Sequence, residues 1–373
     1  MKSKILFILH YPPPVVGASV VGQFIKESQV VNTSFEADYI NLATASSLAQ
    51  LNKGGISKIG TFFKIQWRVI NALFTKSYDL CYLSFTAKGL GFYKDLLIVG
   101  TLKLFGKNVI YHLHNKGVRS NSGNRFNVFC YRFAFNKAKV ILLSPYLFQD
   151  IARYVKEEQV FYCANGIPAT KNKVSLKKQD EGGPCKILFL SNMMVEKGVF
   201  VLLEACRLLK DKGALFECHF VGDWLDMSKS DFQNRVTQYG LNDFVYAHGK
   251  KYNEEKEYFL NSSDIFVLPT YYHNECFPLV LLEAMKHELP IISTPEGGIR
   301  DIVIDNETGF VVPQKDPIAL AEKLELLISA PELRSKLGSA GKRRYEHLFT
   351  LRSFENNITK TLQMSLPKSR LHN

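Results

Sequence analysis

The chain has 373 residues, of which 46% are hydrophobic and 22% are charged. This length exceeds one ordinary α/β domain, and the composition supplies enough apolar residues for buried cores, which excludes a disordered chain. The seven cysteines are scattered and no two stand at CxxC spacing, so the sequence predicts neither a zinc site nor a disulfide framework. That usage favours a reducing compartment.

Positive charge is concentrated in the first half of the chain. Residues 1–170 carry 20 Lys and Arg against eight Asp and Glu, a balance of +12, whereas residues 171–373 carry 27 of each. A basic half predicts a surface for an anionic partner, such as phospholipid or a phosphorylated substrate. The alternative is a solvated basic surface without a partner. The basic part of the chain contains no known nucleic-acid recognition motif, so we expect no nucleic-acid partner.

Short apolar runs alternate with amphipathic stretches from the start of the chain, which is typical of βα units and parallel sheets. The first apolar run meets His10 and three prolines without a signal-peptide cleavage site, and no apolar run is long enough to span a bilayer. We therefore expect neither a transmembrane helix nor export. Helices are expected over 19–31, 92–105 and 145–156. The strands expected in this half are 4–9, 36–41, 80–85, 108–112, 139–143 and 160–163.

A polar, lysine-rich segment interrupts this periodicity and predicts a linker over 169–185. The sequence thus divides into an N-terminal domain, 1–168, and a C-terminal domain, 186–348, followed by a helical tail, 349–373, that can return to the N-terminal domain. The fold class is α/β with two doubly wound domains, whose ligand sites lie at the carboxyl ends of the strands. The strands expected in the second half are 186–190, 217–221, 245–248, 265–268, 290–293 and 310–312.

The loop after the first strand, 11–19, contains three prolines and Gly17. A glycine there lets backbone amides approach a phosphate at the start of the next helix. Gly17 and Gly22 are spaced GxxxxG, but Gln23 and Phe24 follow where a P-loop needs Lys and Ser or Thr, and the GxGxxG fingerprint is absent. The alternative for this loop is an ordinary strand-to-helix turn.

Two further segments can carry chemistry in the second domain. Lys197 follows the first strand of that domain, a suitable position for contact with a diphosphate, although an ordinary surface lysine is the alternative. In the segment 275–285, Pro278 suits a first helical turn, so Glu275 precedes the helix and Glu283 lies inside it. The amides after Phe277 would face an anion. A carboxylate among apolar residues needs hydroxyl donors or a cation, and a ribose supplies two hydroxyls. Nothing in this pattern indicates a metal site.

Four motifs occur in order along the chain: 12–14 with Gly17, 196–198, Glu275-x7-Glu283, and the Gly-Gly segment 297–303. Together they resemble the retaining family-4 glycosyltransferases of the GT-B fold, densely over 186–313 and more sparsely over the first 170 residues. The resemblance implies two Rossmann-like domains with an interdomain cleft. It also implies a nucleotide-diphosphate sugar as donor substrate, without a cofactor or a metal ion.

The resemblance assigns a role to each matching residue. Lys197 would neutralise the diphosphate, Glu283 would take the ribose hydroxyls, and Glu275 would contact the transferred sugar. His114 matches the family's histidine beside the sugar and the acceptor, whereas His112 is more consistent with the core of a strand. The remaining donor-binding positions that the resemblance implies are Gly17, Phe277, Pro278, Leu279 and, in place of the family's arginine, Asn192.

The implied reaction is transfer of a sugar to an acceptor hydroxyl with retained anomeric configuration. Negative charge that develops on the departing diphosphate would be stabilised by Lys197 and helix amides instead of a metal ion. Two alternatives remain at this point: a nucleotide-sugar epimerase on the same fold, and a non-catalytic partner subunit, which only Asn192 suggests. Replacement of the family's small residues by the segment 286–288 has no functional account from the sequence.

The segment 56–76 combines a helical apolar stripe with Lys58, Lys64, Arg68 and Lys76. Its aromatic residues could enter a membrane interface while the cations meet anionic headgroups. The alternative is a core helix with a solvated basic edge. The membrane interpretation makes the acceptor a lipid-linked or membrane-anchored glycan, as in capsule or lipopolysaccharide assembly. It places the protein in the cytoplasm, peripheral to the inner face of the cell membrane.

Overall fold

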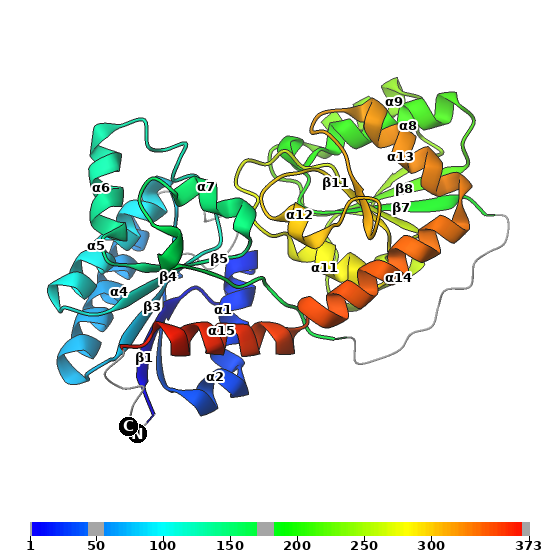
Figure 1. Cartoon of the computed structure of the whole chain (residues 1–373). Coiled ribbons are helices and arrows are strands. Elements are labelled where there is room, and N and C mark those ends of the chain that lie inside the picture. The colour runs from blue at the N-terminus through cyan, green and yellow to red at the C-terminus, as the bar shows by residue number, and fades with distance from the viewer. Residues whose placement is uncertain (1, 44–55, 170–182, 368–373) are drawn as a thin grey trace. The chain divides into compact units, whose positions relative to one another are not determined.

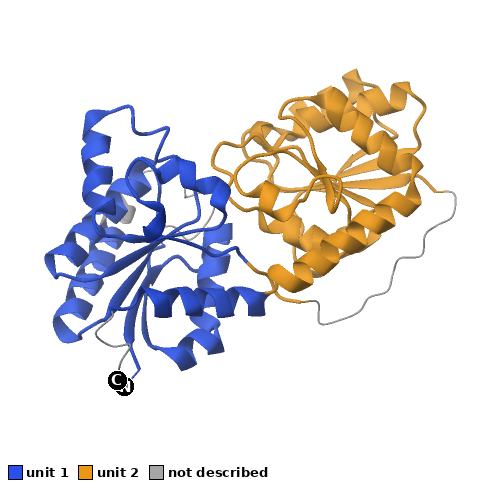
Figure 2. Cartoon of the chain, viewed as in Figure 1, with its two compact units in different colours: residues 1–165, 351–373 blue, residues 166–350 orange. Residues whose placement is uncertain are grey.

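The computed structural model describes residues 2–43, 56–169 and 183–367. The chain forms two compact units (Figure 2): unit 1 comprises Met1–Asn165 and Leu351–Asn373, and unit 2 comprises Gly166–Thr350. Most of the expected linker, 169–185, lies outside the described residues. The chain leaves unit 1 after residue 165 and returns to it at residue 351, where the sequence suggested boundaries at 168 and 349.

Unit 1 is built on a six-stranded parallel sheet in the order β2-β1-β3-β4-β5-β6. The first strand lies inside this sheet, and its apolar run Ile5–Leu9 is almost completely buried because helices cover both faces. The sheet confirms the α/β class expected from the alternating pattern. The strands are β1 (Lys4–Leu9), β2 (Glu36–Asn41), β3 (Leu80–Phe85), β4 (Val109–Leu113), β5 (Lys139–Leu142) and β6 (Val160–Tyr162).

Two helical layers cover the unit 1 sheet (Figure 1). Right-handed crossovers place α4, α5 and α6 on one face and α1 and α2 on the other, where α15 packs against them. The expected single helix 19–31 is wrong, because Ser28 leaves the helical conformation and its side chain caps a second helix by accepting from the Val31 amide. The expected helix 145–156 is also shorter. The helices are α1 (Gly17–Glu27), α2 (Gln29–Ser34), α4 (Ile56–Thr75), α5 (Gly89–Leu104), α6 (Arg125–Phe135), η1 (Pro145–Leu147), α7 (Phe148–Ile151), η2 (Glu157–Gln159) and α15 (Leu351–Ser365).

Unit 2 contains a second six-stranded parallel sheet, in the order β12-β11-β10-β7-β8-β9. Counted from its own first strand, this is the order of dinucleotide-binding Rossmann domains. The order reverses between β7 and β10, so the carboxyl ends of these two strands mark the position where such sheets bind ligands. The strands are β7 (Cys185–Leu190), β8 (Phe216–Val221), β9 (Val245–Ala247), β10 (Ile265–Leu268), β11 (Ile291–Ser293) and β12 (Gly309–Val311).

Helices cover both faces of the unit 2 sheet as well (Figure 1). A short parallel bridge joins Ile167 to Thr350, so the segments at the two ends of unit 2 lie side by side. The helices are η3 (Val195–Lys197), α8 (Val199–Asp211), α9 (Lys229–Gln238), α10 (Asn253–Ser262), α11 (Leu279–Lys286), α12 (Ile299–Ile302), α13 (Pro317–Ser329) and α14 (Pro331–Leu348).

All seven cysteines are buried, and none of them forms a disulfide. Burial raises the pKa of the Cys81 and Cys163 thiols to about 12, so these side chains act as small apolar groups of the core. Within the described residues, no helix combines the length and hydropathy that crossing a membrane requires.

Candidate active site

The loops after β7 and β10 meet at the reversal of strand order in unit 2. The first loop makes the 3₁₀ turn η3, which ends at Gly198 in the left-handed conformation, with φ +86°. A Cβ atom at Gly198 would lie 2.2 Å from the carbonyl oxygen of Pro269, just after β10. Only glycine tolerates both the positive φ and this close approach. Gly198 therefore holds the Lys197 turn against the end of β10.

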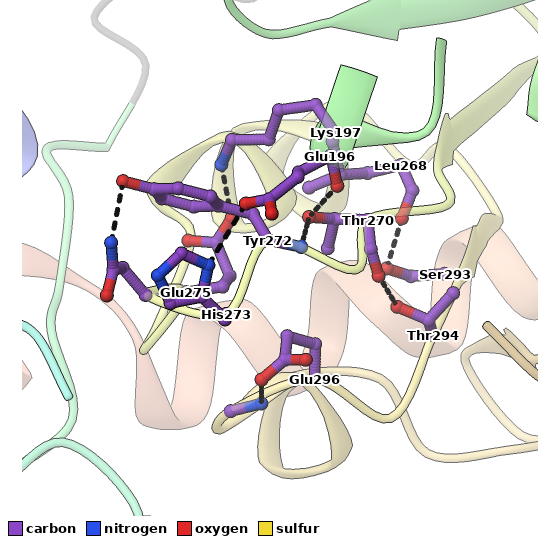
Figure 3. A network of polar contacts seen from close by, with 12 residues as sticks. Glu196, Lys197, Leu268, Thr270, Tyr272, His273, Glu275, Ser293, Thr294 and Glu296 are labelled. Atoms are coloured by element: carbon purple, nitrogen blue, oxygen red, sulfur yellow. Dashed lines mark hydrogen bonds and ion pairs between the residues drawn. The ribbon is translucent and has the colours of Figure 1, made fainter. Parts of the chain in front are cut away.

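Lys197 and Glu275 form an ion pair across these two loops (Figure 3). Their side chains are 13% and 11% exposed, so water screens the pair only partly. The Lys197 ammonium also lies 4.9 Å from the centre of the Tyr272 ring, and the Glu275 amide donates to the Tyr272 carbonyl at 2.8 Å. The structure thus brings together two of the residues that the sequence singled out.

Polar residues at the strand ends support this pair. The carbonyl of Glu196 accepts from the Tyr271 amide at 2.8 Å and from the Thr270 hydroxyl at 3.3 Å. The Glu196 carboxylate contacts His273 Nδ1 at 3.1 Å, and the Thr294 hydroxyl donates to the Thr270 carbonyl (Figure 3). These bonds join the ends of β10 and β11 to the η3 turn and fix the backbone beside Lys197.

The Gly-Gly segment packs behind Glu275. Gly297 has φ +56°, and a Cβ atom there would lie 2.3 Å from the Glu275 carbonyl oxygen. The Gly298 amide donates to the Cys276 carbonyl at 2.7 Å. The next apolar residues of this motif, Ile299 and Ile302, are completely buried. The backbone of this motif therefore packs against the backbone of the Glu275 loop and fixes its position.

The helix α11 begins directly after this loop. Pro278 is its N-cap and not part of its first turn, and proline has no N–H, so Pro278 cannot donate to an anion. The amides of Leu279 and Val280 lie in the first turn, where helical amides lack intrahelical partners. Of the three residues whose amides the sequence assigned to the phosphates, Phe277, Pro278 and Leu279, only Phe277 and Leu279 therefore have an N–H that can donate.

Glu283 lies one turn further along α11. Its Oε1 accepts from the Lys256 ammonium on α10 at 2.7 Å, which supplies the cation that a carboxylate in this apolar helix needs. Its Oε2 is buried and has no hydrogen-bond partner among the described residues. One acceptor atom of this carboxylate is thus available for a donor from a ligand.

Gly17 and His114 both belong to unit 1. Gly17 is the exposed first residue of α1, and no atom of the described residues lies within 4 Å of the Cβ position there. Gly22 differs, because its Cβ would lie 1.8 Å from the carbonyl oxygen of His10. The two glycines of the GxxxxG pattern therefore differ: Gly17 has space for a side chain, whereas Gly22 is required for close packing against the backbone of His10.

His114 follows β4, with its ring 4.1 Å from that of His112. Burial lowers the pKa of His114 to about 4. Burial, with smaller contributions from the positive charges that Lys94 and His114 can carry, lowers the pKa of His10 to about 3. Both histidines are therefore neutral at neutral pH. His112 is fully buried and meets the Tyr82 hydroxyl at 2.6 Å, as expected for a core residue. In the described parts of the chain, no three His, Cys, Asp or Glu side chains form a cluster suited to a metal ion.

Most of unit 2 is similar to a known protein family. Residues 171–344 match the family model described as "Glycosyl transferases group 1". This segment, which we call the group 1 domain, is similar to that family. The group 1 domain includes η3, the Glu275 loop and α11, so the polar network described above lies entirely within it.

Curated relatives of the chain include two named glycosyltransferases. It is 33% identical over 173 residues to the amylovoran biosynthesis glycosyltransferase AmsK of Erwinia amylovora, and the match covers 42% of each chain. It is 30% identical over 196 residues to the capsular polysaccharide biosynthesis glycosyltransferase CapM of Staphylococcus aureus, covering 51% of this chain and 50% of that protein. The matched segments thus span half or less of these relatives.

The fold extends beyond the group 1 domain. The solved structure of Anabaena Alr3699/HepE in complex with UDP has a TM-score of 0.72 and 16% identity, covering 97% of this chain and 100% of that one. Such a likeness shows a shared fold. Together with the two parallel sheets it confirms the expected GT-B architecture.

Two departures of the group 1 domain from the family pattern gain a structural description. Asn192 follows β7 at the same edge of the sheet as Lys197, and its side chain is half-buried. In the segment 286–288, Lys286 and His287 pair with Glu257 on α10, while Glu288 pairs with Lys342 on α14. These charged residues therefore tie the end of α11 to its neighbouring helices.

The sequence analysis missed several members of the site. The Tyr272 ring lies beneath the Lys197 ammonium, and Lys256 pairs with Glu283, yet neither Tyr272 nor Lys256 was singled out. Position alone could have indicated Thr270 and Tyr272, because they follow the expected strand 265–268 at the ligand-binding edge. No local signal indicates Lys256, which lies 27 residues before Glu283 and meets it only in the folded unit.

Proposed function

We propose that the protein transfers a sugar from a nucleotide-diphosphate sugar to a hydroxyl of a glycan acceptor. The observation that carries this proposal is the Lys197–Glu275 pair at the reversal of strand order in the group 1 domain. The pair holds a cation and a carboxylate beside the first turn of α11. A diphosphate bound there would take over Lys197 and release Glu275 toward the sugar.

The donor class is supported by two features. Glu283 keeps one buried carboxylate oxygen without a partner, which suits a ribose hydroxyl. The structural relative HepE has been solved with UDP and with UDP-glucose. We propose the same class of donor for this chain, held by Lys197, Glu283 and the amides around Pro278.

For the chemical step we propose retention of anomeric configuration. The bond from the anomeric carbon to the diphosphate oxygen breaks, the acceptor oxygen bonds to that carbon from the same face, and the departing phosphate takes the acceptor's proton. Lys197 and the α11 amides would stabilise the charge that develops on the diphosphate, without a metal ion or other cofactor. Glu275 would contact the sugar.

The acceptor that we propose is a lipid-linked or surface-polysaccharide glycan. AmsK and CapM are named for amylovoran and capsular polysaccharide biosynthesis, and unit 1 carries the excess of basic residues. Such an acceptor places the protein at the cytoplasmic face of the cell membrane.

The test begins with a thermal-shift screen of nucleotide sugars, because a ligand at 100 times its Kd stabilises a protein by about 2.7 kcal/mol. The stabilising donor is then incubated without acceptor, and the products are analysed by NMR. Slow release of free sugar with an initially retained anomer supports the proposal. An epimerised donor would assign the chain to another reaction, and an intact donor would indicate a non-catalytic subunit. Activity that EDTA abolishes and Mg²⁺ or Mn²⁺ restores would contradict the metal-free step.

A further inference from the structure

Exposed apolar side chains gather on one helical layer of unit 1. Among the described residues, ten of the 22 large exposed hydrophobic side chains lie on α4, α5 and α6, which together hold only 47 residues. Leu90 is 87% exposed and Trp67 is 67% exposed. Single exposed apolar residues are ordinary, whereas a concentration of this kind marks an interaction site. We call these ten residues the three-helix surface: Phe63, Trp67, Phe74, Leu90, Tyr93, Leu97, Leu104, Phe126, Phe129 and Phe133.

The fold does not use this surface for its own core. Helix α4 buries Ile65, Val69 and Leu73 against unit 1, and its exposed aromatic residues lie on a different side. On α5, the exposed leucines recur every seven residues and therefore share one side of the helix. The segment 56–76 thus combines both expectations from the sequence, because one side of α4 belongs to the core and another is available for a partner.

The surface continues from helix to helix. Helix α5 packs between α4 and α6, as Figure 1 shows. The ring of Phe74 lies 4.9 Å from that of Phe105 at the junction of α4 with the end of α5. Tyr93 on α5 and Phe126 on α6 stack with their rings 6.3 Å apart. Aromatic contacts therefore bridge both junctions, so the exposed residues form one surface.

The charge of these helices is positive. They carry seven basic residues and one acidic residue, Asp95, which is completely buried. Lys64 and Arg68 are exposed beside Phe63 and Trp67, and within the described parts of the chain no ion pair neutralises either of them. Lys76 differs, because it pairs with Asp38. The seven basic residues of the three helices are Lys58, Lys64, Arg68, Lys94, Lys103, Arg125 and Arg132.

We propose that the three-helix surface docks on an anionic lipid bilayer. Aromatic rings and leucines would enter the headgroup boundary while Lys64, Arg68 and their neighbours meet the negative charge of the lipids. A second copy of the chain fits less well, because two surfaces of the same positive sign would repel each other. This inference rests on the proposed membrane-anchored acceptor and names the part of the protein that reaches it.

The first experiment is co-sedimentation of the full chain with vesicles of phosphatidylcholine alone or mixed with phosphatidylglycerol. Binding is expected only to the mixed vesicles, and it should weaken as salt rises from 0.01 M to 0.15 M, because the Debye length falls from about 30 Å to about 8 Å. Each basic residue near an anionic surface contributes about five-fold to binding, so K64Q/R68Q should bind about 30-fold more weakly. K229Q/K336Q, which removes the same charge from exposed positions of unit 2, is the matched control and should bind like the wild type.

The second experiment tests the apolar part. W67S/L97S/F129S should lose binding to the mixed vesicles while keeping its melting temperature, because these side chains are exposed. In a Trp224→Phe background, Trp67 is the one remaining tryptophan, and its emission should shift to the blue when mixed vesicles are added. No shift, or equal binding by the triple variant and the wild type, would overturn the proposal. A wild-type dimer that the triple variant converts to a monomer, without vesicle binding, would assign the surface to a second copy.

These measurements are separate from the test of the proposed function. Donor hydrolysis in solution uses residues outside the three-helix surface, so both surface variants should hydrolyse the donor at the wild-type rate. Vesicle binding without donor hydrolysis would refute the proposed function alone. Donor hydrolysis without vesicle binding would refute the docking surface alone.

Discussion

Unit 1 and unit 2 each reverse their strand order beside their first strand, yet they equip that position differently. In unit 2, the ends of β7 and β10 carry the Lys197–Glu275 pair and the hydrogen bonds around it. In unit 1, the end of β1 carries the neutral His10 and leads to the open Gly17. Similar sheets thus provide the same topological position, while the loop residues decide which chemistry can occur there.

The two units also differ in charge more than the two halves of the sequence do. Because α15 belongs to unit 1, that unit contains 24 Lys and Arg against nine Asp and Glu, a balance of +15. Unit 2 contains 23 against 26, a balance of −3. The return of residues 351–373 to unit 1 therefore increases the difference in net charge, which is +12 against zero when the sequence is divided at residue 170. Charge thus favours unit 1 for contact with anionic surfaces.

The largest effect on the free energy of unfolding is expected when Gly198 of unit 2 is compared with Gly17 of unit 1. Gly198→Ala should destabilise the protein by about 2–4 kcal/mol, because it adds a left-handed alanine to a backbone clash. Gly17→Ala should leave the free energy of unfolding within about 0.5 kcal/mol, since none of the residues that the structure describes lies near its Cβ position. Urea denaturation of both variants checks this. Equal losses of stability would remove the distinction between a structural and an open glycine.

The next effect concerns Lys197. Lys197→Ala should lower kcat/KM for the donor by about ten-fold to over a hundred-fold, because a hydrogen bond to a charged group contributes about 1.5–3 kcal/mol. Lys212→Ala is the matched control, since Lys212 also pairs with a glutamate but is exposed on unit 2. Steady-state kinetics of the two folded variants decides the question. Wild-type kinetics in Lys197→Ala would exclude this lysine from the site.

A smaller effect should separate the two glutamates. Glu283→Gln is expected to weaken binding of a nucleoside diphosphate about ten-fold, because an amide replaces the carboxylate proposed to hold the ribose. Glu275→Gln should lower turnover while nucleoside diphosphate binding changes less. Isothermal titration calorimetry with the nucleoside diphosphate measures both. Equal losses in the two variants would contradict the proposed division of roles.

A separate effect should appear in the dependence of stability on pH. His114 has a folded pKa of about 4, below the ordinary value of 6.5, so the unfolded chain binds more protons between these values. Stability should therefore fall as the pH decreases from about 6.5 to about 4, by at most about ten-fold in the folding equilibrium per pH unit for this group. His114→Gln should reduce that slope in thermal melts. An unchanged slope would show that His114 contributes nothing to acid sensitivity.

Much of the fold could be predicted from the sequence, because buried parallel strands are short apolar runs that the chain itself displays. The runs at 4–9, 36–41, 80–85 and 265–268 coincide with β1, β2, β3 and β10. The break at Ser28 was missed because the apolar pattern continues across it, and only the backbone conformation at Ser28 ends the helix. The likeness to GT-B glycosyltransferases followed from spaced motifs, whereas donor, acceptor and retention remain predictions.

The sequence by itself determined which residue types occupy the loops after the strands and the helix that follows, and therefore Lys197, Glu275 and Glu283 as candidates. Only the tertiary structure decided their partners. The pairs Lys197–Glu275 and Lys256–Glu283 join residues 78 and 27 positions apart, and such contacts depend on strand order and loop packing. The same holds for the three-helix surface, because α4, α5 and α6 become neighbours only when right-handed crossovers place them on one face of the sheet.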